Sequence, residues 1–295
     1  ALLGVCREAA ALGAAGSRAA ELQPALVLGL EAADAKTRQL GFELAALVGG
    51  SGGRGWGAAL YQRLRAELTP SPLKGEREQE LKVAVLVAAY DALGMVSGPV
   101  AAAALKDGET LLMAMTHSDP RVRAAAVEAV GNLVARNQLH LLLGSADEPQ
   151  QKAATLAEIV FQLISDPAPN VSCSALGSAA ALLDFAAAGD GRGGQVLGGL
   201  FRALDALVVG LKPDDALQAM LRCPVGLQAA AVRPVVRLVT YGATARHGRS
   251  RDRRDLDPVE ALVRALFAQI TPSQPVALAY EAACGLLEVA RLRVG

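Results

Sequence analysis

The sequence predicts an all-α protein built from stacked pairs of helices, and three observations lead to that prediction. Aromatic residues make up only 3% of the 295 residues. Ala, Leu, Val and Gly dominate the apolar fraction, a mixture that suits close packing between helices better than strands. One stretch, Ser118–Leu133 (SDPRVRAAAVEAVGNL), has the features of a complete helical unit, and related stretches recur along the chain.

This unit joins a helix start signal to an apolar stripe. Ser118 or Asp119 can accept a hydrogen bond from the first amides of a helix, and Pro120 fits the first turn because its missing N–H costs nothing there. We expect Arg121 and Arg123 to stay in water. Apolar residues then recur at three- and four-residue spacing, which places them on one face: Val122, Ala126, Val127, Val130, Leu133 and Val134. A helix this short cannot bury so broad a stripe alone, so the unit requires neighbours.

Variants of the unit supply those neighbours. Each has a capping or breaking residue followed by a helix of small and branched apolar residues: Asp34–Leu47, Leu81–Leu93, Asp166–Leu182 and Thr271–Leu287. The first branched core positions, Val83, Val122 and Val171, are 39 and 49 residues apart. This spacing brackets the roughly 40–47 residues of a HEAT or armadillo unit. The sequence therefore predicts an α-solenoid of HEAT/armadillo-like helix pairs over residues 1–295. We expect it to be a fragment of a longer chain, because no initiator Met precedes Ala1.

Apolar periodicity and breakers place the individual elements. The expected helices are residues 1–16, 22–33, 34–47, 56–68, 76–95, 99–116, 118–133, 137–144, 150–164, 169–187, 195–211, 214–221, 226–245, 258–270 and 275–292. Flexible interruptions are expected near 49–55, 69–75, 189–194 and 246–255. The glycine-rich ones resemble phosphate-binding loops only in glycine content, because they lack the Lys-Ser/Thr ending, so we interpret them as hinges.

The charge balance and the histidines argue against several classes of function. With 29 basic and 29 acidic residues the net charge is zero, so the molecule as a whole has no field that attracts it to nucleic acid or an anionic bilayer. His117, His140 and His247 have no Cys or Asp at ligand spacing and are expected to be solvated or to cap helices. We therefore predict no catalytic residue, no metal and no cofactor. No apolar run is long enough to predict a membrane span.

The cysteines favour a reducing compartment. Cys6, Cys173, Cys223 and Cys284 are scattered, without CxxC spacing. This pattern argues against a zinc site and against a disulfide framework, and it suits thiols that serve as small core residues.

One segment could bind an anionic surface. Residues 246–254 contain five Arg and one His, and such a run is most often a solvated loop. If it binds anything, a lipid headgroup is the better candidate, because nucleic-acid bases would have no aromatic side chain to stack on. The candidate contacts are Arg246, Arg249, Arg251, Arg253 and Arg254.

A short acidic-hydrophobic string has two interpretations. Val27–Glu31 (VLGLE) is similar to the boxes that bind clathrin, but those boxes work as extended, exposed strings. Here the string lies within an expected helix, so we predict that Leu26, Leu28 and Leu30 pack in the core.

Nearly the whole chain shows a weak resemblance to a known family. The stretches that carry it are Asp34–Leu47, Leu81–Leu93, Lys106–Arg136, Asp166–Phe185, Asp215–Ala245 and the closing pair Asp257–Ile270 and Pro275–Ala290. In order and spacing they resemble the N-terminal trunk of the large, adaptin-type subunits of vesicle-coat adaptor complexes. The likeness is strongest to the TPLATE-like, beta-COP-type subunits of TSET complexes.

The resemblance implies a non-catalytic scaffold that acts in clathrin-mediated endocytosis and membrane trafficking. Its expected partners are the small, medium and second large subunits of the complex, with clathrin and an anionic membrane surface as further candidates, and no nucleic acid. The expected location is cytoplasmic and peripheral, on the plasma membrane or coated vesicles. The alternative is another HEAT/armadillo protein-binding scaffold, in nuclear transport or on the cytoskeleton.

Overall fold

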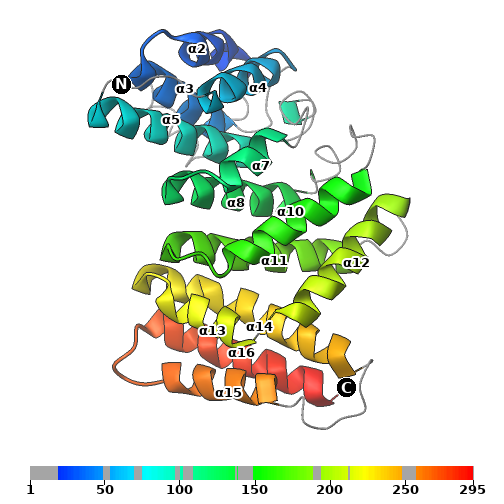
Figure 1. The fold of residues 1–295 in the computed structure, drawn as a ribbon. Helices are drawn as coiled ribbons and strands as arrows, with labels where there is room; N and C mark the ends of the chain where they lie inside the picture. The colour runs from blue at the N-terminus through cyan, green and yellow to red at the C-terminus, as the bar shows by residue number, and fades with distance from the viewer. Residues whose placement is uncertain are drawn as a thin grey trace. The chain divides into compact units, whose positions relative to one another are not determined.

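A computed structural model describes residues 19–48, 54–69, 75–96, 100–101, 109–136, 138, 149–188, 194–211, 213–247 and 257–294. In this part of the chain the regular structure is entirely helical (Figure 1). The helices group into two compact units, residues 1–149 and 150–295. That the chain forms one continuous solenoid stays a prediction, and each unit is treated by itself.

The first unit contains helix hairpins arranged in two ranks. Its described helices are α2 (Ala19–Glu31), α3 (Ala35–Val48), α4 (Arg54–Leu68), α5 (Glu76–Met95), α7 (Glu109–Met115) and α8 (Pro120–Ala135). Helices α2, α4 and α7 contact one another in order, and so do α3, α5 and α8 (Figure 1). Each hairpin joins one helix of each set, so we call α3, α5 and α8 the second rank of this unit.

The second unit also contains a row of three helices packed side by side. Its described helices are α10 (Pro149–Leu163), α11 (Pro169–Ala188), α12 (Gly194–Gly210), α13 (Pro213–Arg222), α14 (Val225–His247), α15 (Asp257–Gln269) and α16 (Val276–Val294). Helices α11, α14 and α16 lie side by side and form the second rank of this unit. Helices α13 and α15 contact each other and pack against that rank, while α12 packs on α11 and α14.

Most helix boundaries agree with the sequence prediction to within three residues, and α5 matches it at both ends. The expected helices 1–16 and 137–144 lie outside the described residues, and most of the expected interruptions do too. Three interruptions are shorter than expected, because α4 already begins at Arg54, α12 begins at Gly194, and α14 runs through Arg246 to His247. Arg has a good helix propensity, and nothing stops α14 before Gly248. Helix α14 also continues through Pro234.

The apolar stripe predicted for α8 is confirmed. Val122, Ala126, Val127, Val130 and Leu133 are all fully buried. Asp119 is the N-cap residue, since its Oδ1 accepts a hydrogen bond of 2.8 Å from the backbone N of Arg121, and Pro120 follows in the first turn. The capping residues and the three-to-four spacing of Ser118–Leu133 therefore predicted both the start of α8 and its buried face.

The prediction for Leu28 is wrong. Leu26 and Leu30 are fully buried, whereas Leu28 is 71% exposed. Residues four apart share a helix face, but the residue between them points about 200° away from either neighbour. Only two of the three leucines can therefore face the core.

In two hairpins of the first unit, an arginine on the second helix donates hydrogen bonds to carbonyls in the turn that follows the first helix. Arg38 Nη1 donates to the carbonyls of Ala32 and Ala33, at 3.1 and 2.6 Å, beyond the end of α2. Arg123 Nη1 donates in the same way to His117 and Ser118, at 2.8 and 2.9 Å, beyond the end of α7. These bonds satisfy carbonyls that a helix end leaves unpaired. Arg123 was expected to stay in water, and instead it is half-buried and locks its hairpin.

In the second unit an amide takes this role. Gln228 Nε2 donates to the carbonyls of Leu221 and Cys223, at 3.2 and 3.0 Å, where α13 ends. The helix α14 that carries Gln228 is again the second of its pair. These two hydrogen bonds from the Gln228 side chain hold the turn between α13 and α14 in place.

Two glycines allow neighbouring helices to touch through their backbones. A Cβ placed on Gly41 of α3 would lie 2.7 Å from the carbonyl carbon of Gly29 in α2. A Cβ on Gly94 of α5 would lie 3.1 Å from the Cα of Ala129 in α8. Real Cβ atoms essentially never come within 3.0 Å of another heavy atom, so the crossing at Gly41 depends on the missing side chain. At Gly94 the contact would be tight, and α8 would have to shift by a few tenths of an ångström.

Candidate partner-binding surfaces

The outer face of the second rank in the first unit carries a row of carboxylates. Glu43 of α3, Asp91 of α5 and Glu128 of α8 interact electrostatically across the three helices. Asp91 and Glu128 are exposed, and Glu43 is half-buried and accepts a hydrogen bond of 3.0 Å from Gln39 Nε2. We call these three residues the acidic row.

The environment of the acidic row disfavours the charged form of Asp91. Although the Asp91 side chain reaches water, the adjacent helices partly desolvate its carboxyl group. This desolvation, with the negative charges of Glu128 and Glu43, raises its pKa to about 6. The charged form of Asp91 is therefore disfavoured, and positive charge brought near this carboxylate would stabilise it.

Positive charge lies at one end of this face, where it is already paired. The guanidinium of Arg121 donates to both oxygens of Glu80, at 2.8 and 2.9 Å, and to Asp119 Oδ2 at 2.9 Å. The hydrogen bond to Arg121 lowers the pKa of Glu80 and also that of Asp119. These groups are largely exposed, so the contact orients α5 against α8 more than it stabilises the fold.

Ion pairs between helices lie along the second rank of the second unit. On α14, Arg233 donates to both oxygens of Glu281 on α16, at 2.7 and 3.2 Å. Arg237 donates to Asp184 on α11 at 2.7 Å and lies 3.8 Å from Glu288 on α16. These pairs link the three helices, and the two arginines and three carboxylates that they join carry a net charge of −1.

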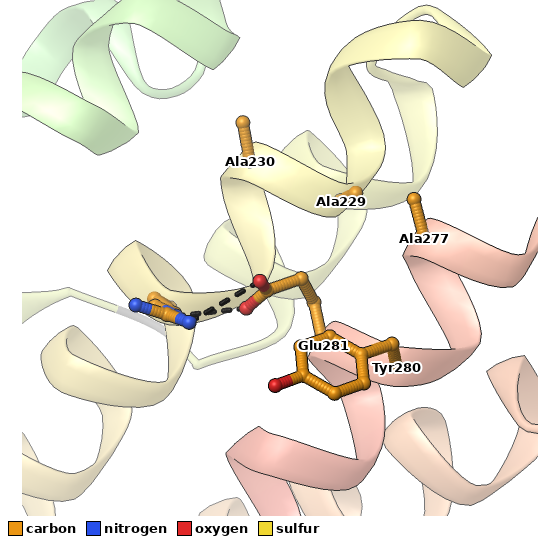
Figure 2. Close-up of a pocket in the computed structure, with 6 residues that line it drawn as sticks. Ala229, Ala230, Ala277, Tyr280 and Glu281 are labelled. Atoms are coloured by element: carbon orange, nitrogen blue, oxygen red, sulfur yellow. Dashed lines mark hydrogen bonds and ion pairs between the residues drawn. The ribbon is translucent and has the colours of Figure 1, made fainter.

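A groove lies between α14 and α16 on this rank. It has a volume of about 380 Å³ and is lined by Ala229, Ala230, Arg233, Ala277, Tyr280 and Glu281. Figure 2 shows Ala229 and Ala230 on α14 opposite Ala277 on α16, with Tyr280 and Glu281 one turn further along. The Tyr280 side chain is 64% exposed, and Val276, one turn before it, is 86% exposed. The groove thus combines three alanine side chains with the exposed ring of Tyr280 and one ion pair.

A metal site would require several titratable side chains of the described ranges to lie close together. No group of three or more His, Cys, Asp or Glu side chains among them lies close enough to bind a metal ion. Within the same ranges, no helix combines the length and the apolar character that crossing a membrane requires.

Comparison with known proteins identifies one hairpin directly. A family model for the HEAT repeat matches residues 109–136, which are the α7–α8 hairpin. The fold is an all-α solenoid of HEAT-type helix pairs. The match includes the stretch Ser118–Leu133, from which the sequence prediction began, and that prediction of fold class is confirmed. A search of curated proteins finds no match.

Three known structures are similar to this chain at low sequence identity. An engineered protein is 14% identical, with 90% of this chain and 96% of that chain covered and a TM-score of 0.49. A homology model of the full-length AP-3 complex in an intermediate open conformation is 11% identical, with coverages of 91% and 44% and a TM-score of 0.46. The karyopherin Kap121p, bound to the SUMO protease Ulp1p, is 14% identical, with coverages of 92% and 29% and a TM-score of 0.39.

The candidate lipid contacts are mostly outside the described residues. Arg246 lies in the last turn of α14, while Arg249, Arg251, Arg253 and Arg254 belong to residues 248–256, which the structure does not describe. His117 accepts a hydrogen bond of 3.0 Å at Nδ1 from the backbone N of Asp119, the N-cap residue of α8.

Two features of the described residues were not predicted from the sequence. The acidic row brings together residues from three helices, and the Cys173 side chain interacts with the Cys223 thiol. Neither has a local signal, because each depends on the way separate helices cross. The helix-face positions of Asp91 and Glu128 could have been predicted, but not their proximity.

Proposed function

We propose that this protein is a non-catalytic scaffold that binds partner proteins along the outer faces of its second-rank helices. More specifically, we propose that it is a large subunit of a vesicle-coat adaptor complex that acts in clathrin-mediated endocytosis. The observation that carries the proposal is the acidic row on the exposed face of α3, α5 and α8. Helix-pair repeats bind partners through extended surface of this kind rather than through a pocket.

The acidic row favours a partner with basic side chains at this position. Partial desolvation and, to a smaller extent, the negative charges of Glu128 and Glu43 raise the pKa of Asp91. A Lys or Arg from a partner would stabilise the charged form of Asp91 on binding, and this interaction would contribute to association. Charge complementarity of this sort mainly governs specificity and association rate.

In the second unit, the groove between α14 and α16 offers a partner a surface for apolar contact. Tyr280 is an aromatic side chain with a polar tip, a type enriched where interfaces have energetic hot spots. The alanine floor allows a partner side chain or helix to approach closely. We propose that the two units each contact a partner, and that the protein itself contributes no catalytic residue.

The adaptor assignment is supported by the sequence resemblance and by the HEAT unit at residues 109–136. It makes the small, medium and second large subunits the expected partners, with clathrin and an anionic membrane surface as further ones. It also places the protein in the cytoplasm, peripherally on the plasma membrane or on coated vesicles.

Affinity purification of the whole protein from its own cells tests this function. We expect small and medium adaptor-type subunits to co-purify in near-equal amounts with the tagged chain. Recovery of nuclear-transport cargo or tubulin in their place would contradict the adaptor assignment and favour the alternative scaffold role.

The Arg-rich segment gives a separate prediction about membranes. We propose that Arg246, Arg249, Arg251, Arg253 and Arg254 contact anionic lipid headgroups. The protein should then float with vesicles that contain phosphatidylserine. Replacing the last four by Ala should reduce the bound fraction at least tenfold at low salt, because each cation near such a surface contributes about 1 kcal/mol.

A charge-conserving variant controls this experiment. Replacing the same four residues by Lys should leave flotation nearly unchanged, since the attraction is to charge and not to side-chain shape. Equal flotation of the Ala variant and the native protein would refute the lipid contact without affecting the proposed partner surface.

A further inference from the structure

Two cysteines that are far apart in the sequence meet in the second unit. Cys173 lies in the second turn of α11, and Cys223 directly follows the last residue of α13. Helices α11 and α13 pack together, and α14, which begins two residues after Cys223, also packs on α11. The Cys173 side chain interacts with the Cys223 thiol and raises its pKa.

The surroundings fix Cys223 and leave Cys173 accessible. Cys223 is only 3% exposed, and its backbone N donates to the carbonyls of Ala219 and Met220, at 3.2 and 3.1 Å. The Sγ of Cys223 donates to the Ala219 carbonyl at 3.3 Å. The carbonyl of Cys223 accepts a hydrogen bond of 3.0 Å from Gln228 Nε2. Cys173 is half-buried, so a small solute can reach it first.

We propose that Cys173 and Cys223 form a reversible disulfide that joins α11 to the turn between α13 and α14. The oxidant is a low-molecular-weight disulfide of the glutathione class. The link goes beyond the proposed scaffold function and would form whether or not the chain is an adaptor subunit.

The chemistry proceeds by two thiol–disulfide exchanges. The Cys173 thiolate attacks one sulfur of the small disulfide, forms a mixed disulfide and releases one small thiolate, which takes up a proton. The Cys223 sulfur, after losing its proton to solvent, then attacks the Cys173 sulfur and releases the second small thiol. Two protein thiols are oxidised to one disulfide, and one small disulfide is reduced to two thiols.

The order of these steps follows from the two environments. The interaction with the Cys173 side chain and burial raise the pKa of the Cys223 thiol, so this group stays protonated at neutral pH. Cys173 is therefore the initial nucleophile. The second exchange limits the rate and should accelerate as the pH rises, since it requires the Cys223 thiolate.

The test exposes the full-length protein to increasing ratios of oxidised to reduced glutathione and then alkylates the remaining thiols. We expect a peptide pair joined through Cys173 and Cys223 in the mass spectrum, and a Tm about 5–10 °C higher than that of the reduced protein. Both changes should reverse with reductant. Half-exposed Cys284, on α16, serves as the matched control and should form only a mixed disulfide.

Two variants keep the test decisive. Cys173→Ser should fold normally and show neither the link nor the rise in Tm, whereas Cys284→Ser should keep both. The proposal is overturned if Cys173 carries only glutathione, or if Cys173 and Cys223 are both alkylated, at a ratio that has already modified Cys284.

Discussion

Gly41→Ala should lower the free energy of unfolding by about 2–3 kcal/mol, the cost of forcing extra atoms into a packed site. The new Cβ would lie 2.7 Å from the carbonyl carbon of Gly29 and 2.8 Å from the backbone N of Leu30. Both atoms are backbone, so relief requires α2 and α3 to separate. The loss should outweigh the gain of about 1 kcal/mol that Ala brings to a helix interior.

Urea denaturation followed by circular dichroism measures this effect, and Gly177→Ala is the matched control. Gly177 lies inside α11 and has no heavy atom within 4 Å of the Cβ that Ala would add. That variant should gain up to about 1 kcal/mol from helix propensity alone. A similar response of the two variants would show that α2 and α3 do not cross as described.

Glu67→Ala should destabilise the first unit by about 2–3 kcal/mol, because it removes the shared partner of two partly buried cations. Glu67 is 7% exposed, and its Oε1 accepts from Arg38 Nε at 2.6 Å and from Arg63 Nε at 2.8 Å. Without the carboxylate, Arg38 keeps only its bonds to carbonyls at the end of α2. The ion pair between Arg38 on α3 and Glu67 on α4 is then lost.

An exposed pair of the same chemistry provides the comparison. Glu260 and Arg264 on α15 are joined at 2.6 Å, but both side chains are more than half exposed. Glu260→Ala should therefore change the free energy of unfolding by less than about 0.5 kcal/mol. If chemical denaturation gives the two Ala variants equal losses, burial does not determine the strength of the Glu67 cluster.

Local features of the sequence predicted most of the helices. Caps such as Asp119, breakers such as Pro70 and the three-to-four spacing of Val122 and its neighbours act within one or two turns. They can therefore be recognised without knowledge of the fold. The prediction that Leu28 is buried was wrong, because an acidic-hydrophobic run does not reveal which face of a helix is buried.

The remaining features depend on contacts between helices. Arg38 and Arg123 look like solvated residues of a first helical turn, yet each reaches the end of the preceding helix. Asp91 and Glu128 become neighbours only when α5 packs beside α8. Spacing along the chain contains no information on such distances, so neither the acidic row nor the thiol pair was predicted.

The acidic row offers the most direct test of the scaffold proposal. The affinity purification should be repeated with Glu128→Lys, which reverses one charge of the row, and with Glu31→Lys, which makes the same change at the end of first-rank helix α2. Both residues are exposed, so the fold should tolerate either change. Circular dichroism checks this point.

We predict that Glu128→Lys weakens recovery of the adaptor-type subunits at least tenfold, equivalent to about 1.4 kcal/mol, because a basic partner would meet a like charge. Glu31→Lys should recover them as the native protein does. Unchanged recovery with Glu128→Lys, or equal losses with both variants, would contradict a partner surface on α3, α5 and α8.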